Sequence, residues 1–302
     1  MDDLAFLNDL RAWFTRRTDA WLTEDCDPRG GSGAEYARRR ALMSKRGAVD
    51  EYVLCRVQLL GTCGRGEETV QRAREHLLFL YEQAGQMATE ERALDHVVFA
   101  SSDKPVVLCG DNLTRTPSAR PMADFASQSQ VERMYRRDGA GFEPRRGVRY
   151  AQRWWNSRNP DYPQFENDCA NFVSQALFAA GHPMTFSDDR ATGWWFRRDP
   201  QTDWSFSWSV AHALVAYLRL TAEGECPAAV REHAQDLDEG DVIAYDWSGD
   251  GRYDHVALVT GRDAVGEPLV HAHTVDSADR HWSYEDSASW TPATGYLFLH
   301  LG

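Results

Sequence analysis

The chain has 302 residues, and 33 basic against 46 acidic side chains give it a net charge of −13. An acidic excess of this size argues against a nucleic-acid partner, because binding to phosphates needs a basic surface. Its 42% hydrophobic and 26% charged residues exclude wholesale disorder, and no apolar run approaches the roughly 18 residues of a membrane span, so no membrane partner is expected.

The first half of the chain predicts a small α+β domain over residues 1–112. Apolar residues recur at helical spacing over 4–22, a glycine-rich break follows at 30–33, and a second helix is expected over 34–45. Four later stretches are expected to form an antiparallel meander: 49–60, 69–83, 92–102 and 105–109. The 69–83 stretch also fits a helical period. A helix on a curved meander is the arrangement of cystatin-like and NTF2-like folds.

Residues 113–145 are expected to form a linker, with a short helix over 124–135. The remainder, 146–302, predicts a second α+β domain, in which helices precede an antiparallel sheet. Its helices are expected over 148–156, from an N-cap at Asn167 or Asp168 to a stop at Gly181, and over 208–220. Its strands are expected over 241–247, 255–261, 268–274 and 295–301.

The six cysteines are too sparse for a disulfide scaffold, and no CxxC pair indicates zinc. The acidic N-terminus lacks the basic region of a secretory signal. We therefore expect a cytoplasmic protein with free thiols and no metal or organic cofactor. The composition leaves the oligomeric state open.

Cys169 has a context unlike the other five cysteines, because it stands in the first turn of a predicted helix. Free N–H groups and the helix dipole there favour a thiolate, which is the attacking form of the side chain. The common alternative is a buried cysteine that fills space. Polar neighbours at Asn167, Asp168 and Asn171 favour chemistry at this position. We expect Asp168 itself to cap the helix.

His255 opens the strand HVALVTG and is a candidate base, since a cysteine nucleophile needs one within hydrogen-bond reach. A surface or core histidine is the plain alternative. His271 and His273 lie in the next strand and point to one side, because side chains alternate along a strand. If the two strands pair, one of these histidines can orient the base.

These blocks resemble a known family. The segments YAQRWWNSRNPDYPQFENDCANFVSQAL, GWWF, SWSVAHAL, GDVIAYDWSGDGRYDHVALVT and LVHAHT are similar to the putative amidase domains, relatives of the NlpC/P60 and CHAP cysteine peptidases. The resemblance covers about residues 146–300 and implies a papain-like domain of NlpC/P60 type. It assigns Cys169 as nucleophile and His255 as base. The family's HT pair favours His273 as the third member, whereas the HA pair of the NlpC/P60 group favours His271.

Several further residues have two open interpretations. Four tryptophans form either a groove wall or core: Trp194, Trp195, Trp204 and Trp208. Gln164 and Asn171 are candidates for an oxyanion donor. The DWSGDG stretch at 246–251 copies half of a calcium loop, but the twelfth position is Ala257 instead of glutamate, which favours a tight turn.

The leading hypothesis is a cysteine amidohydrolase that forms a thioester on Cys169, with His255 holding an ion pair and His273 orienting it. Its substrate would be a small-molecule or peptide amide with an aromatic or apolar part. Many relatives act on cell-wall peptide, but the lack of an export signal favours an intracellular amide. Two alternatives are an acyltransferase that passes the acyl group to an amine and a non-catalytic peptide-binding module.

Overall fold

A computed structural model describes residues 10, 12–14, 16, 31–65, 68–100, 105–109, 141–198, 201–220 and 228–302. Its contacts divide the chain into two compact units. Unit 1 joins Met1–Thr114 with Val275–Ser277 and Ser283–Trp290, and unit 2 comprises Arg115–Thr274, Ala278–Trp282 and Thr291–Gly302. Two short segments from late in the chain therefore belong to the N-terminal unit. The sequence prediction of one domain over 1–112 and another over 146–302 does not include this exchange. Both units combine helices with antiparallel strands, so the α+β class is confirmed.

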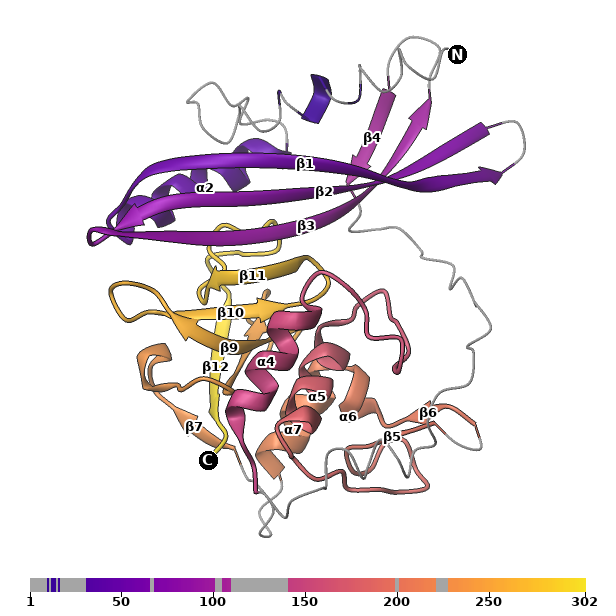
Figure 1. The fold of residues 1–302 in the computed structure, drawn as a ribbon. Coiled ribbons are helices and arrows are strands. Elements are labelled where there is room, and N and C mark those ends of the chain that lie inside the picture. Colours follow the sequence, from indigo (N-terminus) through magenta and orange to yellow (C-terminus); the bar gives the residue numbers. More distant parts are fainter. Residues whose placement is uncertain are drawn as a thin grey trace. The chain divides into compact units, whose positions relative to one another are not determined.

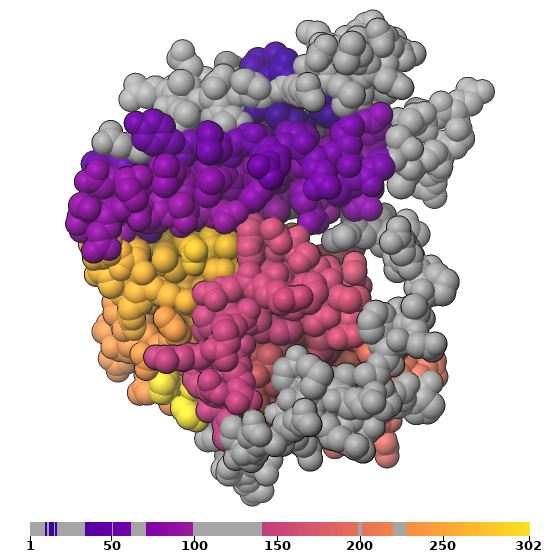
Figure 2. Space-filling model, in the orientation of Figure 1, coloured from indigo at the N-terminus to yellow at the C-terminus, as the bar shows by residue number. Residues whose placement is uncertain are grey.

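In the described part of unit 1, the helix over 31–45 precedes an antiparallel meander (Figure 1). Its elements are α2 (Gly31–Lys45), β1 (Ala48–Arg65), β2 (Glu68–Gln83), β3 (Gln86–Ala100) and β4 (Pro105–Cys109). On the face seen in Figure 2, β1–β3 form one continuous purple band of surface.

The expected meander is confirmed. Residues 69–83, which also fit a helical period, lie in strand β2. β2 hydrogen-bonds to a strand on each side, which satisfies its backbone groups without a helix. The β2–β3 hairpin turns on Ala84 and Gly85, whose φ angles of 50° and 77° are the left-handed pair that a type I′ turn requires. Of the first expected helix, residues 10, 12–14 and 16 are helical, and the rest lies outside the described residues. The expected 124–135 helix and most of the 113–145 linker also lie outside them.

Charged side chains form part of the interior of unit 1. Arg39 of α2, Glu90 and Arg92 of β3, and Asp286 are each at most 2% exposed. Arg39 Nη1 lies 3.0 Å from Glu90 Oε2 and 3.1 Å from Asp286 Oδ2, and Arg92 also pairs with Asp286. The Arg39 guanidinium stacks on the Phe79 ring, 3.7 Å from its centre. Buried charges are tolerated only when paired, so this cluster joins the 283–290 segment to α2 and β3.

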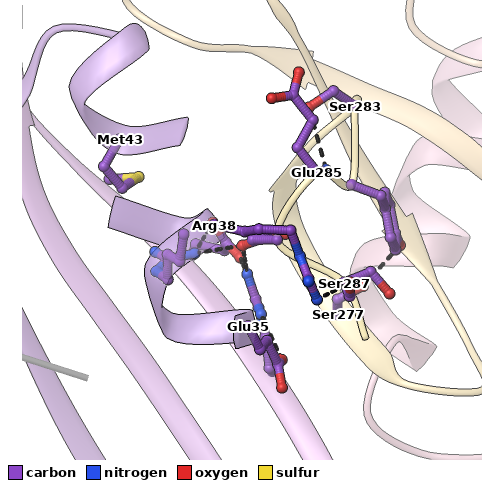
Figure 3. Close-up of polar contacts among 12 residues, drawn as sticks. Glu35, Arg38, Met43, Ser277, Ser283, Glu285 and Ser287 are labelled. Carbon is purple, nitrogen blue, oxygen red and sulfur yellow. Dashed lines mark hydrogen bonds and ion pairs between the residues drawn. The ribbon is translucent and has the colours of Figure 1, made fainter. Parts of the chain in front are cut away.

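Polar contacts around the cluster continue along the same segment (Figure 3). Arg38 donates to the Ser287 carbonyl at 2.8 Å, and the Ser277 and Tyr284 hydroxyls lie 3.1 Å apart. At the rim, Lys45 pairs with Glu285 at 2.9 Å, with the lysine side chain 69% exposed.

Asp286→Ala should lower the free energy of unfolding by about 3–5 kcal/mol, because it leaves two buried arginines short of a carboxylate. Urea unfolding of the full chain measures this. Glu285→Ala removes only an exposed ion pair and is the matched control, with an expected loss under about 1 kcal/mol. Equal losses in the two variants would contradict the role assigned to the buried cluster.

Unit 2 packs helices on an antiparallel sheet whose strand order is β10-β9-β8-β12-β7. The helices are α4 (Pro144–Trp154), α5 (Cys169–Ala179), α6 (Phe206–Ser209), α7 (Ala211–Leu220) and the 3-10 turn Ala234–Asp236. The sheet strands are β7 (Ala229–Arg231), β8 (Val242–Asp246), β9 (His255–Arg262), β10 (Pro268–Ala272) and β12 (Gly295–His300). The pair β5 (Phe196–Arg197) and β6 (Asp203–Trp204) stands apart, and β11 (Asp276–His281) follows β10 along the chain.

The core of unit 2 lies between α5 and the sheet. Phe172 and Val173 of α5 are fully buried in one cluster with Val256 and Leu258 of β9. Helix α4 approaches α5 closely at Gly147, where a Cβ would lie 2.8 Å from the Ala176 carbonyl oxygen. No helix in the described part of the chain is long and apolar enough to cross a membrane.

Two sequence expectations for unit 2 need correction. The single helix over 208–220 is divided into α6 and α7, because Val210 is extended, with φ −121° and ψ 124°. The Ser205 side chain caps α6 by accepting the Trp208 N–H. Strands β7 and β11 were not expected, and the sequence of β11, DSADRH, lacks the apolar pattern that signals a strand.

Candidate active site

Cys169 is the first residue of α5, as the sequence predicts, and it is only 4% exposed. Burial raises the pKa of the Cys169 thiol above its usual value, although the neighbouring backbone of Val256 and Ala170 and the Thr274 side chain act in the opposite direction. The expected thiolate at a helix start is therefore not favoured in the free protein, because loss of water outweighs the local donors.

Asp168 precedes Cys169 and is a buried carboxylate with several partners. Its Oδ2 lies 2.7 Å from His273 Nδ1 and 3.0 Å from Arg158 Nε. Its Oδ1 accepts from the Asn171 amide at 2.8 Å and from the Phe165 N–H at 3.1 Å. Burial alone would raise the pKa of Asp168, but the hydrogen bond to His273 and the attraction of His273 and Arg158 hold it below its usual range. The residue is thus ionised.

The expected helix cap at Asp168 is right in position and wrong in mechanism. The Asp168 backbone carbonyl accepts the first helical hydrogen bond, from Phe172 N–H at 2.9 Å. Its side chain makes no capping hydrogen bond. The carboxylate turns away from the helix N–H groups because stronger charged partners are within reach.

His273 does not orient His255 in this structure. Its Nδ1 binds Asp168, its Nε2 lies 2.8 Å from the Trp154 carbonyl oxygen, and its ring stacks on Phe172 at 4.0 Å. His271, the other candidate for the third member, binds the Thr260 hydroxyl at 2.7 Å. Burial lowers the pKa of His271 to about 3, so it is neutral.

A β-bulge in β9 explains why the side chains of His271 and His273 lie on the other face of the sheet from His255. Leu269 pairs with Gly261, but Val270 pairs with Val259, so the register shifts by one residue at Thr260. A one-residue shift moves every following side chain to the other face of the sheet. His271 consequently lies opposite Leu258, on the face that packs on α5.

His255 opens β9 as expected, opposite Tyr245 of β8. Alternation places its ring on the face away from Val256, where it packs on Tyr245 at 5.4 Å and on Trp247 at 5.8 Å. Burial, together with the positive charge of Arg280, lowers the pKa of His255 to about 3. The residue after His255 is the one whose backbone contacts the Cys169 sulfur, so the structure brings Cys169 to the start of β9.

Of the two alternatives for the four tryptophans, groove wall or core, the structure places three in the core. Trp194, Trp195 and Trp208 are at most 1% exposed, and their indole N–H groups bind Ser174, Thr192 and Asn171 respectively. Trp204 alone is half-buried, with its ring 5.0 Å from that of Phe165. The aromatic surface of these three side chains therefore packs in the core and does not line an open groove.

The two expected oxyanion donors have different surroundings. The Asn171 amide donates to the Pro163 carbonyl and to Asp168, and its oxygen accepts from Trp208, so it has a structural role. Gln164 is exposed, five positions before Cys169.

The DWSGDG stretch at 246–251, which resembles half of a calcium loop, forms a turn, as the sequence predicts. The Asp246 carboxylate accepts the N–H groups of Gly249, Asp250 and Gly251 at 2.6–3.2 Å. Among the residues that the structure describes, no group of three His, Cys, Asp or Glu side chains is arranged to hold a metal ion.

Two residues of the site were not found from the sequence. Arg158 pairs with Asp168, and the Thr274 hydroxyl accepts the Asp168 N–H at 3.3 Å. Both lie in the blocks that carry the family resemblance, but an arginine in a loop and a threonine at a strand end have no chemical signature of their own.

The sequence profile described as a putative amidase domain matches residues 141–298, more than half of the chain. The match includes Cys169, Asp168, His255 and His273. The chain belongs to the putative amidase domain family. The chain is 46% identical to the uncharacterized protein YhbB of Bacillus subtilis over 154 residues, which is 51% of this chain and 48% of YhbB.

A second Bacillus subtilis protein, the uncharacterized YjcM, is 32% identical over 130 residues, 40% of this chain and 28% of YjcM. The chain thus spans at most about half the length of these relatives. No solved structure matches the chain.

Iodoacetamide should alkylate Cys169 with a pH midpoint above about 8.5, the usual value of a free thiol, because burial disfavours the thiolate. Peptide mass spectrometry at a series of pH values measures the rate, with the half-buried Cys55 as internal comparison. A midpoint below pH 7 would contradict the neutral resting thiol and indicate a preformed ion pair.

Proposed function

We propose that the amidase domain cleaves an amide bond through a thioester on Cys169, with His255 moving the protons. The observation that carries this proposal is the placement of the sulfur. It lies at the first turn of α5, beside the backbone of Val256, the residue that follows His255 at the start of β9. A cysteine at a helix start that lies beside the first residues of a histidine-bearing strand, in a chain of the putative amidase domain family, supports nucleophilic catalysis.

The resting state of this proposal has a neutral thiol and a neutral imidazole. Burial disfavours the charged form of each, which raises the pKa of Cys169 and lowers that of His255 to about 3. The sequence predicts a resting ion pair between the Cys169 thiolate and His255. In this proposal the thiol instead gives its proton to His255 during the attack. The sulfur bonds to the amide carbon as its proton passes to His255, and the carbonyl becomes an oxyanion.

His255 then returns that proton to the amide nitrogen. The C–N bond breaks, the amine leaves, and the acyl group remains on Cys169 as a thioester. A water molecule attacks the thioester while His255 takes its proton, and collapse releases the carboxylic acid and the Cys169 thiol. An imidazole with a lowered pKa is a weak base but a strong acid once protonated, which favours protonation of a poor leaving group such as an amine.

The remaining groups have supporting roles in this proposal. Asp168, His273 and Arg158 form a buried ionic support beneath the first turn of α5. Gln164 is the remaining candidate for an oxyanion donor, since the Asn171 amide is already used. The order of a cysteine-bearing helix followed by a histidine-bearing antiparallel strand is that of papain-like hydrolases, and we include that fold in the proposal.

The tryptophans no longer argue for an aromatic substrate, because three of the four lie in the core. The proposed substrate class is therefore an amide or peptide without a preference for an aromatic group.

Cys169→Ala and His255→Ala should each lower amine release by about 1000-fold or more, because each removes a group that acts in the transition state. A panel of N-acyl amides and dipeptides, assayed for primary amine, measures this with the full chain. Cys55→Ala removes the half-buried thiol of unit 1 and should retain full activity. Hydrolysis that survives in Cys169→Ala would rule out the proposed nucleophile.

A further inference from the structure

His273 has a partner on each ring nitrogen, and both partners are acceptors. Its Nδ1 lies 2.7 Å from Oδ2 of Asp168, and its Nε2 lies 2.8 Å from the Trp154 carbonyl oxygen. A peptide carbonyl has no proton to donate. The Asp168 carboxyl has none either, because its pKa lies below the usual range. A neutral imidazole has one N–H and one lone pair, so it could satisfy only one of these two contacts.

The surroundings of the ring also favour a positive charge on it. Trp154 is the last residue of α4, and the negative end of a helix dipole stabilises a cation. The Phe172 ring stacks on the imidazole, with the ring centres 4.0 Å apart and an angle of 28° between the planes, which suits a cation over an aromatic face. The distance from Nδ1 to Asp168 is that of a charge-assisted hydrogen bond.

His271, two positions earlier, is a matched comparison. The two side chains are equally buried, with His271 3% and His273 2% exposed. Nδ1 of His271 accepts the Asp279 N–H at 3.4 Å and lies beside the Thr260 hydroxyl, which is able to donate. A nitrogen that accepts carries no proton, which agrees with the neutral state of His271. The partners, and not the burial, therefore distinguish the two rings.

The charged groups near His273 leave room for a cation. Asp168 is the carboxylate on the ring, and Arg158 Nε lies 3.0 Å from the same Oδ2. Arg153, in the last turn of α4, stacks on the Trp154 indole, 5.2 Å from its centre. Both arginines thus have a partner of their own, and each nitrogen of His273 faces an oxygen.

We propose that His273 is a positioning residue that acts as a buried imidazolium, which joins the end of α4 to Asp168 at the start of α5 and takes no part in proton transfer. This inference deepens the proposed function and rests on it, because the first turn of α5 carries Cys169. A general base needs a lone pair on a ring nitrogen, whereas both nitrogens of His273 donate.

The contact with Asp168 fixes the beginning of the helix. The Asp168 carbonyl accepts the Phe172 N–H at 2.9 Å, which is the first hydrogen bond of α5. His273 holds the Asp168 side chain and stacks on the Phe172 ring, so it contacts both ends of this hydrogen bond. Loss of the imidazolium should therefore loosen the turn that carries Cys169.

Nitrogen-15 NMR of the ring nitrogens tests the charge directly. The full chain, labelled at its ten histidines, is measured at pH 7.5, at which about nine-tenths of an unperturbed histidine is neutral. Ring contacts to Phe172 and to Thr260 assign the signals of His273 and His271 respectively. We expect a proton on both ring nitrogens of His273 and on only one ring nitrogen of His271. A bare nitrogen on His273 would overturn the inference.

Backbone hydrogen exchange tests the positioning role. His273→Gln keeps a side-chain donor and loses the charge, and it should speed exchange at the Phe172 N–H by about 10–100-fold, the value of a hydrogen bond to a charged group. His271→Gln is the matched control, because it changes a neutral buried ring of the same strand, and it should leave this exchange within about twofold of the parent. Unchanged exchange in His273→Gln, or an equal rise in both variants, would contradict the positioning role.

Neither measurement needs a substrate, so both are independent of amide cleavage. The NMR experiment uses the parent chain and decides the charge even if His273→Gln does not fold. Amide hydrolysis that persists in Cys169→Ala would refute the proposed function and leave the charge of His273 standing. A neutral His273 in a chain that still needs Cys169 for hydrolysis would refute the inference alone.

Discussion

The site depends on one buried carboxylate, Asp168, at the start of α5. An ionised group without water must find its charge and hydrogen-bond partners within the protein. Those partners come from three separate segments, at Arg158, at Asn171 and at His273, and each is drawn to the same point. The residue that follows Asp168 is Cys169, the first residue of α5. Pairing of one charge therefore fixes the start of α5, where the proposed nucleophile lies.

The same constraint organises unit 1, where Asp286 is paired with Arg39 and Arg92. In both units a buried carboxylate binds a basic side chain from a distant part of the sequence, His273 at Asp168 and two arginines at Asp286. Such pairs contribute little net free energy compared with apolar packing, but removal of one partner is costly. This asymmetry makes them effective at selecting one arrangement of the chain. It also accounts for the folding of 283–290 with the N-terminal unit.

Much of this fold could be predicted because its signals are local. The alternation of apolar residues identified β8, β9, β10 and β12, and the N-cap and glycine signals around NDCANFVSQALFAAG identified α5. The position of Cys169 at a helix start and of His255 at a strand start followed from these elements. The family resemblance was carried by the same two blocks, and the profile match over 141–298 supports it.

The errors concern quantities that depend on tertiary structure. A single extra residue at Thr260 changes the register of β9 and β10, so strand alternation counted from the sequence places His271 and His273 on the wrong face. The expected thiolate overlooked burial, which outweighs the helix start at Cys169. The tryptophan cluster could not be assigned because burial, not composition, separates a core from a groove. Thr274 belongs to the HT pair, but its φ of 90° is not signalled by any local pattern.

The central claim is that the acyl group passes through the sulfur of Cys169. Acid quenching during turnover of an amide substrate, followed by peptide mass spectrometry, tests it most directly, because a thioester is stable in acid. The account predicts that the peptide containing Cys169 gains the mass of the acyl group and loses it on treatment with hydroxylamine. Acylation of a different peptide would contradict it.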